Sequence, residues 1–168
     1  MKSDVKIIVT DLWEDFPHEA VQALEASGVN YEVADQGAVS ALTHEKHVLL
    51  VTWHRCDTEF LGNLNNCRGI VRIGVGFDNI DADTAAQYGI PVSNVPDYCL
   101  GEVADHAMAM ALSLARGLPF LERKLQSGEW KPSELPHPVA GFETLTFGVL
   151  GMGRIGSATL HRARPFGF

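Results

Sequence analysis

Long apolar runs, an excess of basic residues and a paired set of cysteines are all missing from this 168-residue sequence. No apolar run approaches the roughly 20 residues that a helix needs to span a bilayer. The first residues lead into a strand-like segment without the pattern of a signal peptide. We therefore expect a cytoplasmic protein with no membrane partner. The formal net charge of −8 argues against general binding to nucleic acid, which requires a basic surface.

Cysteine is scarce as well. Cys56, Cys67 and Cys99 are widely spaced and odd in number, so they indicate reduced thiols and not a disulfide framework. Internal repeats and low-complexity tracts are absent, and a hydrophobic fraction of 46% is ordinary for a globular protein. The length predicts one domain, or one domain and a fragment of another.

Short apolar strands alternate with helices up to about Val95. The strands are predicted at residues 6–10, 31–33, 48–52, 69–73 and 90–93, and the helices at 17–27, 60–64 and 82–88. The wholly apolar third strand is expected at the centre of a sheet, and Pro91 favours an edge position for the fifth. Asp81 is expected to cap the third helix and Gly89 to end it. This alternation predicts an α/β fold with a parallel, flavodoxin-like sheet.

A different organisation begins after Val95. Residues 100–118 are rich in Ala, Met and Leu, with no glycine or proline between Glu102 and Arg116, which predicts a long, largely buried helix. Met108 and Met110 are expected in its core face. Residues 128–141 contain three prolines and Trp130 and are predicted to form a loop.

The most informative local pattern covers residues 146–156, where an apolar run passes into Gly-x-Gly-x-x-Gly and then into helix-forming residues. Gly151 permits a tight turn, Gly153 lets the backbone approach a pyrophosphate, and Gly156 lets the helix pack against the strand. The N–H groups and the dipole at the helix start favour phosphate. The pattern therefore predicts a strand, a turn and a helix that bind a dinucleotide.

Four segments together resemble the NAD-dependent D-2-hydroxyacid dehydrogenase family, in the branch related to phosphoglycerate dehydrogenase and the C-terminal binding proteins. They are VRIGVGFDNID at 71–81, GIPVSNVP at 89–96, EVADH at 102–106 ahead of Arg116, and TLTFGVLGMGRIG at 144–156. The first 69 residues fit only as a βαβ pattern. The resemblance implies a flavodoxin-like substrate domain over residues 1–98. Residues 99–168 would form a linking helix, a loop and the first βα unit of a Rossmann domain, truncated here. In the family the last helix of the chain returns to the first domain.

The resemblance also implies roles for individual residues. The backbone N–H groups of Val75 and Gly76 would receive the substrate carboxylate, as an anion held by converging amides. Val103 would lie near the nicotinamide. The cofactor, NAD with NADP not excluded, would be held by the glycine-rich turn through Gly151, Gly153, Arg154, Ile155 and Gly156. The implied substrate is a small 2-hydroxy or 2-keto acid, and the implied assembly is a homodimer through the linking helix and the loop after it.

Other functional residues of the family are expected beyond Phe168. An acidic residue that selects NAD is expected about 20 residues after the glycine motif. The family's catalytic Arg, Glu and His also fall downstream, so no residue of this chain is assigned a catalytic role, and the chain alone is expected to be inactive. A second hypothesis therefore stays open, in which the chain is a non-catalytic remnant or a dimerising, corepressor-like binding module.

Several single residues allow two interpretations. Gly74 and Gly76 could form a plain strand-to-helix turn. His54 follows the third strand at the edge where α/β clefts form, so it could face the substrate or simply fill a loop. His44 and His47 have no third ligand at usable spacing and indicate a solvated helix end, with no metal site expected. His106 is expected to be packed or to lie in an interface.

Overall fold

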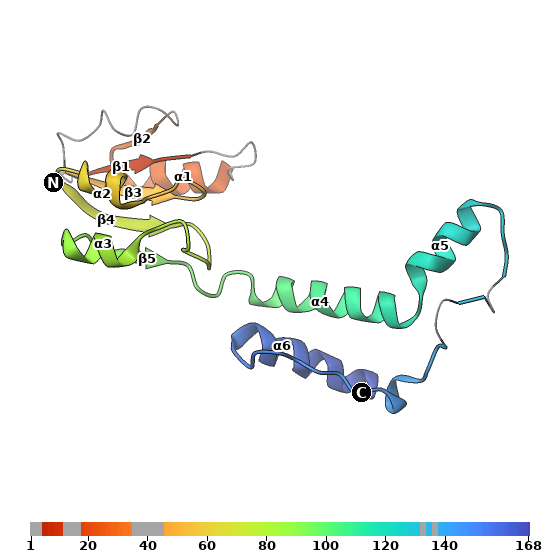
Figure 1. The fold of residues 1–168 in the computed structure, drawn as a ribbon. Helices are drawn as coiled ribbons and strands as arrows, with labels where there is room; N and C mark the ends of the chain where they lie inside the picture. The colour runs from red at the N-terminus through yellow and green to blue at the C-terminus, as the bar shows by residue number, and fades with distance from the viewer. Residues whose placement is uncertain (1–4, 12–17, 35–45, 132–133, 136–137) are drawn as a thin grey trace. The chain divides into compact units, whose positions relative to one another are not determined.

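The computed structural model describes residues 5–11, 18–34, 46–131, 134–135 and 138–168. The chain forms two compact units, Met1–Tyr98 and Cys99–Phe168, which are drawn in Figure 1. No helix in these described ranges has both the length and the apolar character required to cross a membrane.

The first unit contains one sheet of five parallel strands in the order β2-β1-β3-β4-β5. The strands are β1 (Lys6–Val9), β2 (Tyr31–Val33), β3 (His47–Val51), β4 (Cys67–Arg72) and β5 (Val92–Asn94). The apolar β3 is central and β5, directly after Pro91, is an edge strand, as predicted. This strand order is that of flavodoxin-like folds, in which the connections reverse direction between β1 and β3. The predicted α/β fold with a parallel sheet is confirmed.

Three helices accompany these strands: α1 (His18–Ser27), α2 (Thr58–Gly62) and α3 (Ala82–Gln87). The carboxylate of Asp81 accepts a hydrogen bond from the Thr84 backbone N–H and so caps α3, as predicted. Gly89 follows α3 with a φ of +68°, a left-handed conformation that glycine adopts without strain.

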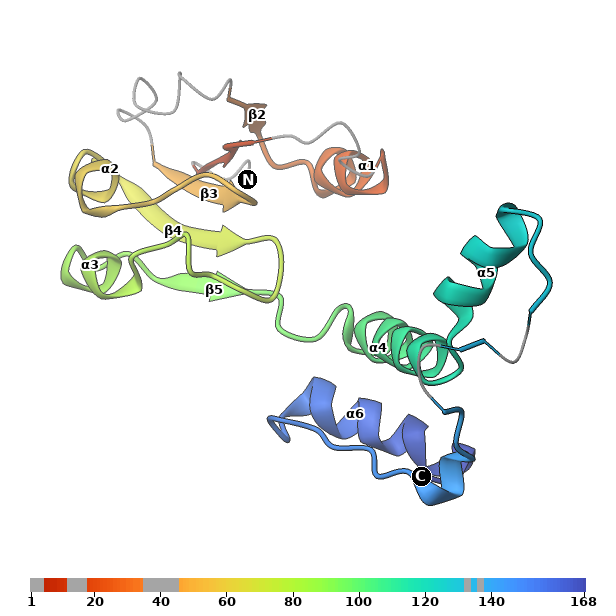
Figure 2. The same ribbon diagram turned by 45° about the vertical axis from the view of Figure 1, so that its right-hand side comes forward.

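The two faces of the sheet are covered unequally. Side chains alternate between faces along a strand, and the buried core lies on the face that carries α2 and α3. This core consists of Ile8, Ala34, Leu49, Val51, Cys56, Leu61, Ile70, Ile80, Ala85 and Ile90. On the opposite face Ile7 and Leu50 are only half-buried beside α1. Figure 2 shows α1 apart from α2 and α3.

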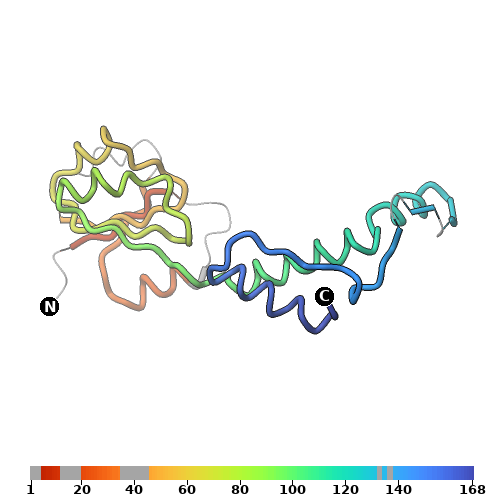
Figure 3. Tube along the Cα trace, turned by 60° about the horizontal axis from the view of Figure 1, so that its bottom comes forward, coloured from red at the N-terminus to blue at the C-terminus, as the bar shows by residue number. Residues whose placement is uncertain are grey.

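The second unit consists of helices α4 (Leu100–Ala115), α5 (Leu118–Gln126) and α6 (Arg154–Ala163), with short 3-10 turns η2 (Phe142–Thr144) and η3 (Arg164–Phe166). Helices α4 and α6 run side by side, as Figures 2 and 3 show. Ala104 and Met108 of α4 are buried, and so are Thr159 and Ala163 of α6. Arg162 of α6 also forms an ion pair with Asp105 of α4.

The prediction of a single, largely buried helix over residues 100–118 is wrong in two respects. Gly117, with a φ of +66°, ends the first helix, and α5 begins directly after it. The helix is also not largely buried, because Met110 and Leu114 are 54% and 62% exposed. Met108 is in the core as predicted, whereas Met110 is not. His106 is exposed in this chain and not packed.

The strand predicted over residues 146–150 does not form either. A strand exists through hydrogen bonds to a neighbour, and in the described part of the second unit no other strand is present to supply them. Leu150 is fully exposed, while Val149 and Ile155 are half-buried.

Candidate functional site

The carboxyl ends of the parallel strands meet at one edge of the sheet, where clefts form in α/β proteins. The loops at this edge are those after β1, β3, β4 and β5. Val75 and Gly76, predicted to bind substrate, lie in the loop after β4, and His54 lies in the loop after β3.

Hydrogen bonds to two backbone carbonyl groups hold the loop after β4. The Asn94 side-chain N–H donates to the Val75 carbonyl at 2.7 Å, and the Val95 N–H donates to the Gly74 carbonyl at 3.1 Å. The N–H groups of Val75 and Gly76 donate no hydrogen bond to any described residue. Gly76 is exposed and Val75 half-buried, so these two amides remain available to an anion.

The loop after β3 is held by a buried carboxylate from the end of β1. Asp11 is 5% exposed and accepts hydrogen bonds from the backbone N–H groups of Thr52, Trp53 and His54 and from the Thr10 hydroxyl. Burial raises the pKa of the Asp11 carboxyl, but these four donors lower it further than burial raises it, so the pKa lies below its ordinary value.

His54 does not lie open in the loop. Its ring contacts the Phe60 ring edge to face, with centroids 4.7 Å apart. Its Nε2 atom is buried and has no hydrogen-bond partner among the described residues. The packing on Phe60 favours the loop-filling interpretation, although the position at the carboxyl edge is the expected one.

Sequence reasoning missed Arg72, which lies beside Gly74, and Trp53, whose ring lies near the Arg72 guanidinium. The Arg72 guanidinium carbon lies 5.5 Å from the centre of the Trp53 ring, and Nη1 of Arg72 donates to the Ile73 carbonyl at 3.1 Å. A Cβ on Gly74 would lie 1.4 Å from the same Nη1. The signal was a cation at the last position of β4, two residues before Gly74.

The glycine-rich turn in the second unit leads into α6 as predicted, although the segment before it is not a strand. Gly151 has a φ of +94°, and a Cβ on Gly156 would lie 1.9 Å from the Gly151 carbonyl oxygen. Gly153 is the residue before the first turn of α6, and no side chain caps this helix. Arg154 and Ile155 follow in that first turn, Arg154 exposed and Ile155 half-buried.

The remaining predicted residues are scattered. Val103, on α4, is 39% exposed. His44 lies outside the described residues, and His47 is not at a solvated helix end but is buried at the start of β3. No cluster of potential metal ligands occurs in the ranges that the structure describes.

The cysteines are free thiols. Burial, and after it the negative charge of Asp11, raise the pKa of Cys56 to about 12. A thiol with this pKa is almost entirely protonated at neutral pH and is therefore a poor nucleophile. Cys56 is part of the core and not of a reactive centre.

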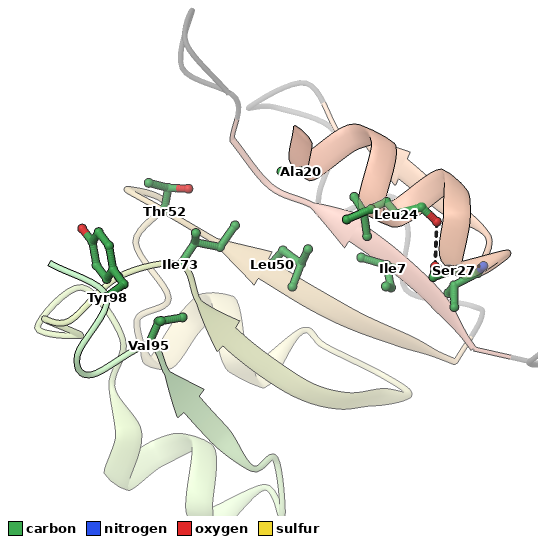
Figure 4. Close-up of a pocket in the computed structure, with 12 residues that line it drawn as sticks. Ile7, Ala20, Leu24, Ser27, Leu50, Thr52, Ile73, Val95 and Tyr98 are labelled. Atoms are coloured by element: carbon green, nitrogen blue, oxygen red, sulfur yellow. Dashed lines mark hydrogen bonds between the residues drawn. The ribbon is translucent and has the colours of Figure 1, made fainter. Parts of the chain in front are cut away.

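An apolar groove runs along the sheet face beside α1 (Figure 4), with a volume of about 610 Å³. Ala20 and Leu24 of α1 form one side, and Leu50, Ile73 and Tyr98 lie across from them. Among the described residues that line it, only those of α1 belong to a helix.

Comparison with known proteins places this architecture. Residues 7–163 match the model of the D-isomer specific 2-hydroxyacid dehydrogenase catalytic domain. The chain is 40% identical over 125 residues to a glyoxylate reductase of Thermococcus litoralis, which covers 71% of this chain and 38% of that protein. It is 35% identical over 175 residues to a D-3-phosphoglycerate dehydrogenase of Methanocaldococcus jannaschii, which covers 97% of this chain and 31% of that protein. The chain thus spans well under half the length of both relatives.

Among solved structures, a D-lactate dehydrogenase from Aquifex aeolicus complexed with NAD and lactic acid superimposes with a TM-score of 0.81 at 27% identity. The superposition covers 96% of this chain and 49% of the other. The fold and these matches define an α/β protein with a parallel, flavodoxin-like sheet. The chain belongs to the D-isomer specific 2-hydroxyacid dehydrogenase family, which confirms the resemblance found in the sequence.

Proposed function

We propose that the chain is the N-terminal part of an NAD-dependent dehydrogenase that interconverts a small 2-hydroxy acid and the corresponding 2-keto acid. Residues 1–98 form its substrate domain, and residues 99–168 form the linking helix, the loop and the start of its nucleotide-binding domain. NADP remains an alternative cofactor, and the cytoplasm is the proposed location. No catalytic residue is assigned, so these 168 residues alone are expected not to consume NADH.

The substrate carboxylate is proposed to bind at the N–H groups of Val75 and Gly76. Two adjacent backbone N–H groups without acceptors can bind the oxygens of one carboxylate. Asn94 fixes the loop through its hydrogen bond to the Val75 carbonyl. The Arg72 guanidinium adds positive charge beside Gly74, which favours an acid over a neutral substrate. His54 is retained as a neighbouring residue of the substrate, in the same group of loops.

The observation that carries the cofactor assignment is the environment of Gly153. Gly151 needs glycine for its positive φ, and Gly156 needs it because a Cβ would meet the Gly151 carbonyl. Gly153 has an ordinary φ of −74°, and a Cβ there would meet nothing within 4 Å. The fold therefore does not require glycine at position 153, whereas close approach of a pyrophosphate does.

The residues of the turn fit the group they are proposed to hold. The N–H groups of Arg154, Ile155 and Gly156 are in the first turn of an uncapped ten-residue helix, where backbone donors and the dipole attract phosphate. Val103 is assigned to the nicotinamide side. The bound cofactor would supply hydride transfer, while this chain would bind and orient the dinucleotide and the acid.

The test is binding of NADH to Gly153→Ala, measured from the amide shifts of Arg154 and Ile155 in nitrogen–proton NMR spectra. We expect NADH to shift both amides in the parent chain and the variant to bind about tenfold more weakly or worse, equivalent to about 1.4 kcal/mol or more. Gly148→Ala is the matched control, because its methyl group also enters open space outside the turn. Parent amides that do not respond to NADH, or equal binding by both variants, would contradict the assignment.

A second candidate function, a dimerising binding module, has support from α5. Leu118, Leu125 and Trp130 are 53%, 53% and 74% exposed and line one pocket of about 420 Å³. Contiguous exposed apolar side chains indicate an interaction surface. We assign this surface, the α5 face, to a homodimer that also involves α4, in either candidate function.

The apolar groove beside α1 is assigned to a helix from elsewhere in the full-length protein, because a parallel sheet is normally covered on both faces. The returning last helix that the family resemblance implies is the proposed occupant.

A further inference from the structure

We propose that Asp11 is a positioning residue for the substrate-binding edge of the sheet. Its carboxylate sets the conformation of the Thr52–His54 loop together with the Asn79 side-chain amide, which binds carbonyl groups of the same loop. The inference rests on the proposed function of the neighbouring Val75 and Gly76 amides. Asp11 itself is buried and acts only through the loop.

The carboxylate joins two strands at the point where the connections of the sheet reverse. Asp11 follows β1 and the loop follows β3, two strands that pair directly. The Thr52 N–H donates to Oδ1 at 3.0 Å, the His54 N–H donates to Oδ2 at 3.2 Å, and the Trp53 N–H also donates to Oδ2. Three successive backbone donors therefore converge on one side chain more than 40 residues away in sequence.

Asn79 holds the same loop by its carbonyl groups. Its side-chain N–H donates to the His54 carbonyl at 2.7 Å and to the Thr52 carbonyl at 3.4 Å. Asn79 belongs to the segment that follows Gly76, so the loops after β3 and β4 are connected. A backbone bond from the Cys56 N–H to the Asn79 carbonyl at 2.9 Å reinforces that connection.

Arg72 links Trp53 of this loop to the proposed carboxylate site. Trp53 is 70% exposed, and its ring lies near the Arg72 guanidinium. The guanidinium in turn lies beside Gly74. Since Asp11 binds the Trp53 N–H directly, loss of the carboxylate is expected to displace the ring and its cationic partner.

Asp11→Asn tests this role with little change in volume. An amide nitrogen at one of the two positions would face N–H donors that need an acceptor, so the loop should leave its conformation. The reporter is Trp53 in a background of Trp13→Phe and Trp130→Phe, read by emission wavelength and by acrylamide quenching. Amide shifts of Val75 and Gly76 on addition of glyoxylate are recorded in parallel.

We expect Asp11→Asn to shift the Trp53 emission, to change its quenching and to weaken the glyoxylate response about tenfold, with far-ultraviolet circular dichroism preserved. Asp57→Asn is the matched control, because Asp57 caps α2 a few residues further on and accepts nothing from the Thr52–His54 loop. The control should behave as the parent. If Asp11→Asn fails to fold, Asn79→Ala should give the same Trp53 signature from the other side of the loop.

Unchanged Trp53 emission and quenching in a folded Asp11→Asn, or in Asn79→Ala if that variant is needed, would overturn the positioning role. A changed signature with an unaltered glyoxylate response would also overturn it, because the loop would then be irrelevant to binding. If the parent itself gives no glyoxylate response while Trp53 does respond to Asp11→Asn, the proposed function fails, and the control of the loop by Asp11 stands.

Discussion

A carboxylate that is almost fully buried is stable only when donors surround it, and Asp11 accepts hydrogen bonds from four. A hydrogen bond to a charged group makes a net contribution of about 1.5–3 kcal/mol to stability. The pKa of the Asp11 carboxyl lies below its ordinary value of 3.8. This direction is expected when the hydrogen bonds stabilise the ionised form by more than burial destabilises it.

The lowered pKa predicts that the free energy of unfolding decreases in acid. Because the pKa is lower in the folded chain, the ionised carboxylate contributes stability above pH 3.8 that is lost as the pH falls through the folded value. We expect Asp11→Asn to reduce the free energy of unfolding by about 2 kcal/mol at pH 7 and by less at pH 3, measured by urea denaturation. A constant difference between the two proteins at both pH values would contradict this origin.

At the scale of elements, the start of α6 depends on a close approach of two backbones. A Cβ on Gly156 would lie 1.9 Å from the Gly151 carbonyl oxygen and 3.1 Å from the Val149 side chain. Alanine is favoured over glycine inside a helix by about 1 kcal/mol, but this clash requires the turn or the helix to move.

We expect the clash to outweigh helix propensity in Gly156→Ala, so that overpacking lowers the free energy of unfolding by about 1–3 kcal/mol. The measurement is amide hydrogen exchange in α6, which should become faster at Thr159 and Ala163, the buried residues of this helix. Gly148→Ala, whose methyl group meets open space, serves as the control. Slower exchange in Gly156→Ala would mean that helix propensity outweighs the clash.

At the scale of the whole molecule, the α5 face bears on the state of assembly. Light scattering should give a compact particle of twice the 18.3 kDa chain mass. Leu125→Glu should shift it towards the monomer, because a charge would be buried without a partner in the interface. Gln126→Glu provides the comparison, because it adds the same charge at an exposed residue of the same helix that does not line this pocket. A parent that is monomeric at all concentrations, or that forms only large aggregates, would contradict the proposed dimer.

Local signals allowed much of the first unit to be predicted. The cap at Asp81, the left-handed Gly89 and the apolar run of β3 each act within a few residues, so their consequences could be read from neighbouring positions. The parallel α/β fold and the family followed from the order of such segments. The position of Val75 and Gly76 after β4 was predicted for the same reason.

Features that depend on distant partners could not be predicted in this way. The hydrogen bonds of Asp11 to the Thr52–His54 loop join residues about 40 positions apart. The contact of Trp53 with Arg72 depends on the relative positions of the loop after β3 and the end of β4. His47 was misassigned because its burial comes from neighbouring strands. The run at 146–150 has the composition of a strand, but the described part of the second unit contains no neighbouring strand to pair with it. Sequence by itself determined the elements of the first unit and the family, since both depend on local patterns. Only the tertiary structure decided which backbone groups have partners, since hydrogen bonds and burial depend on residues far along the chain.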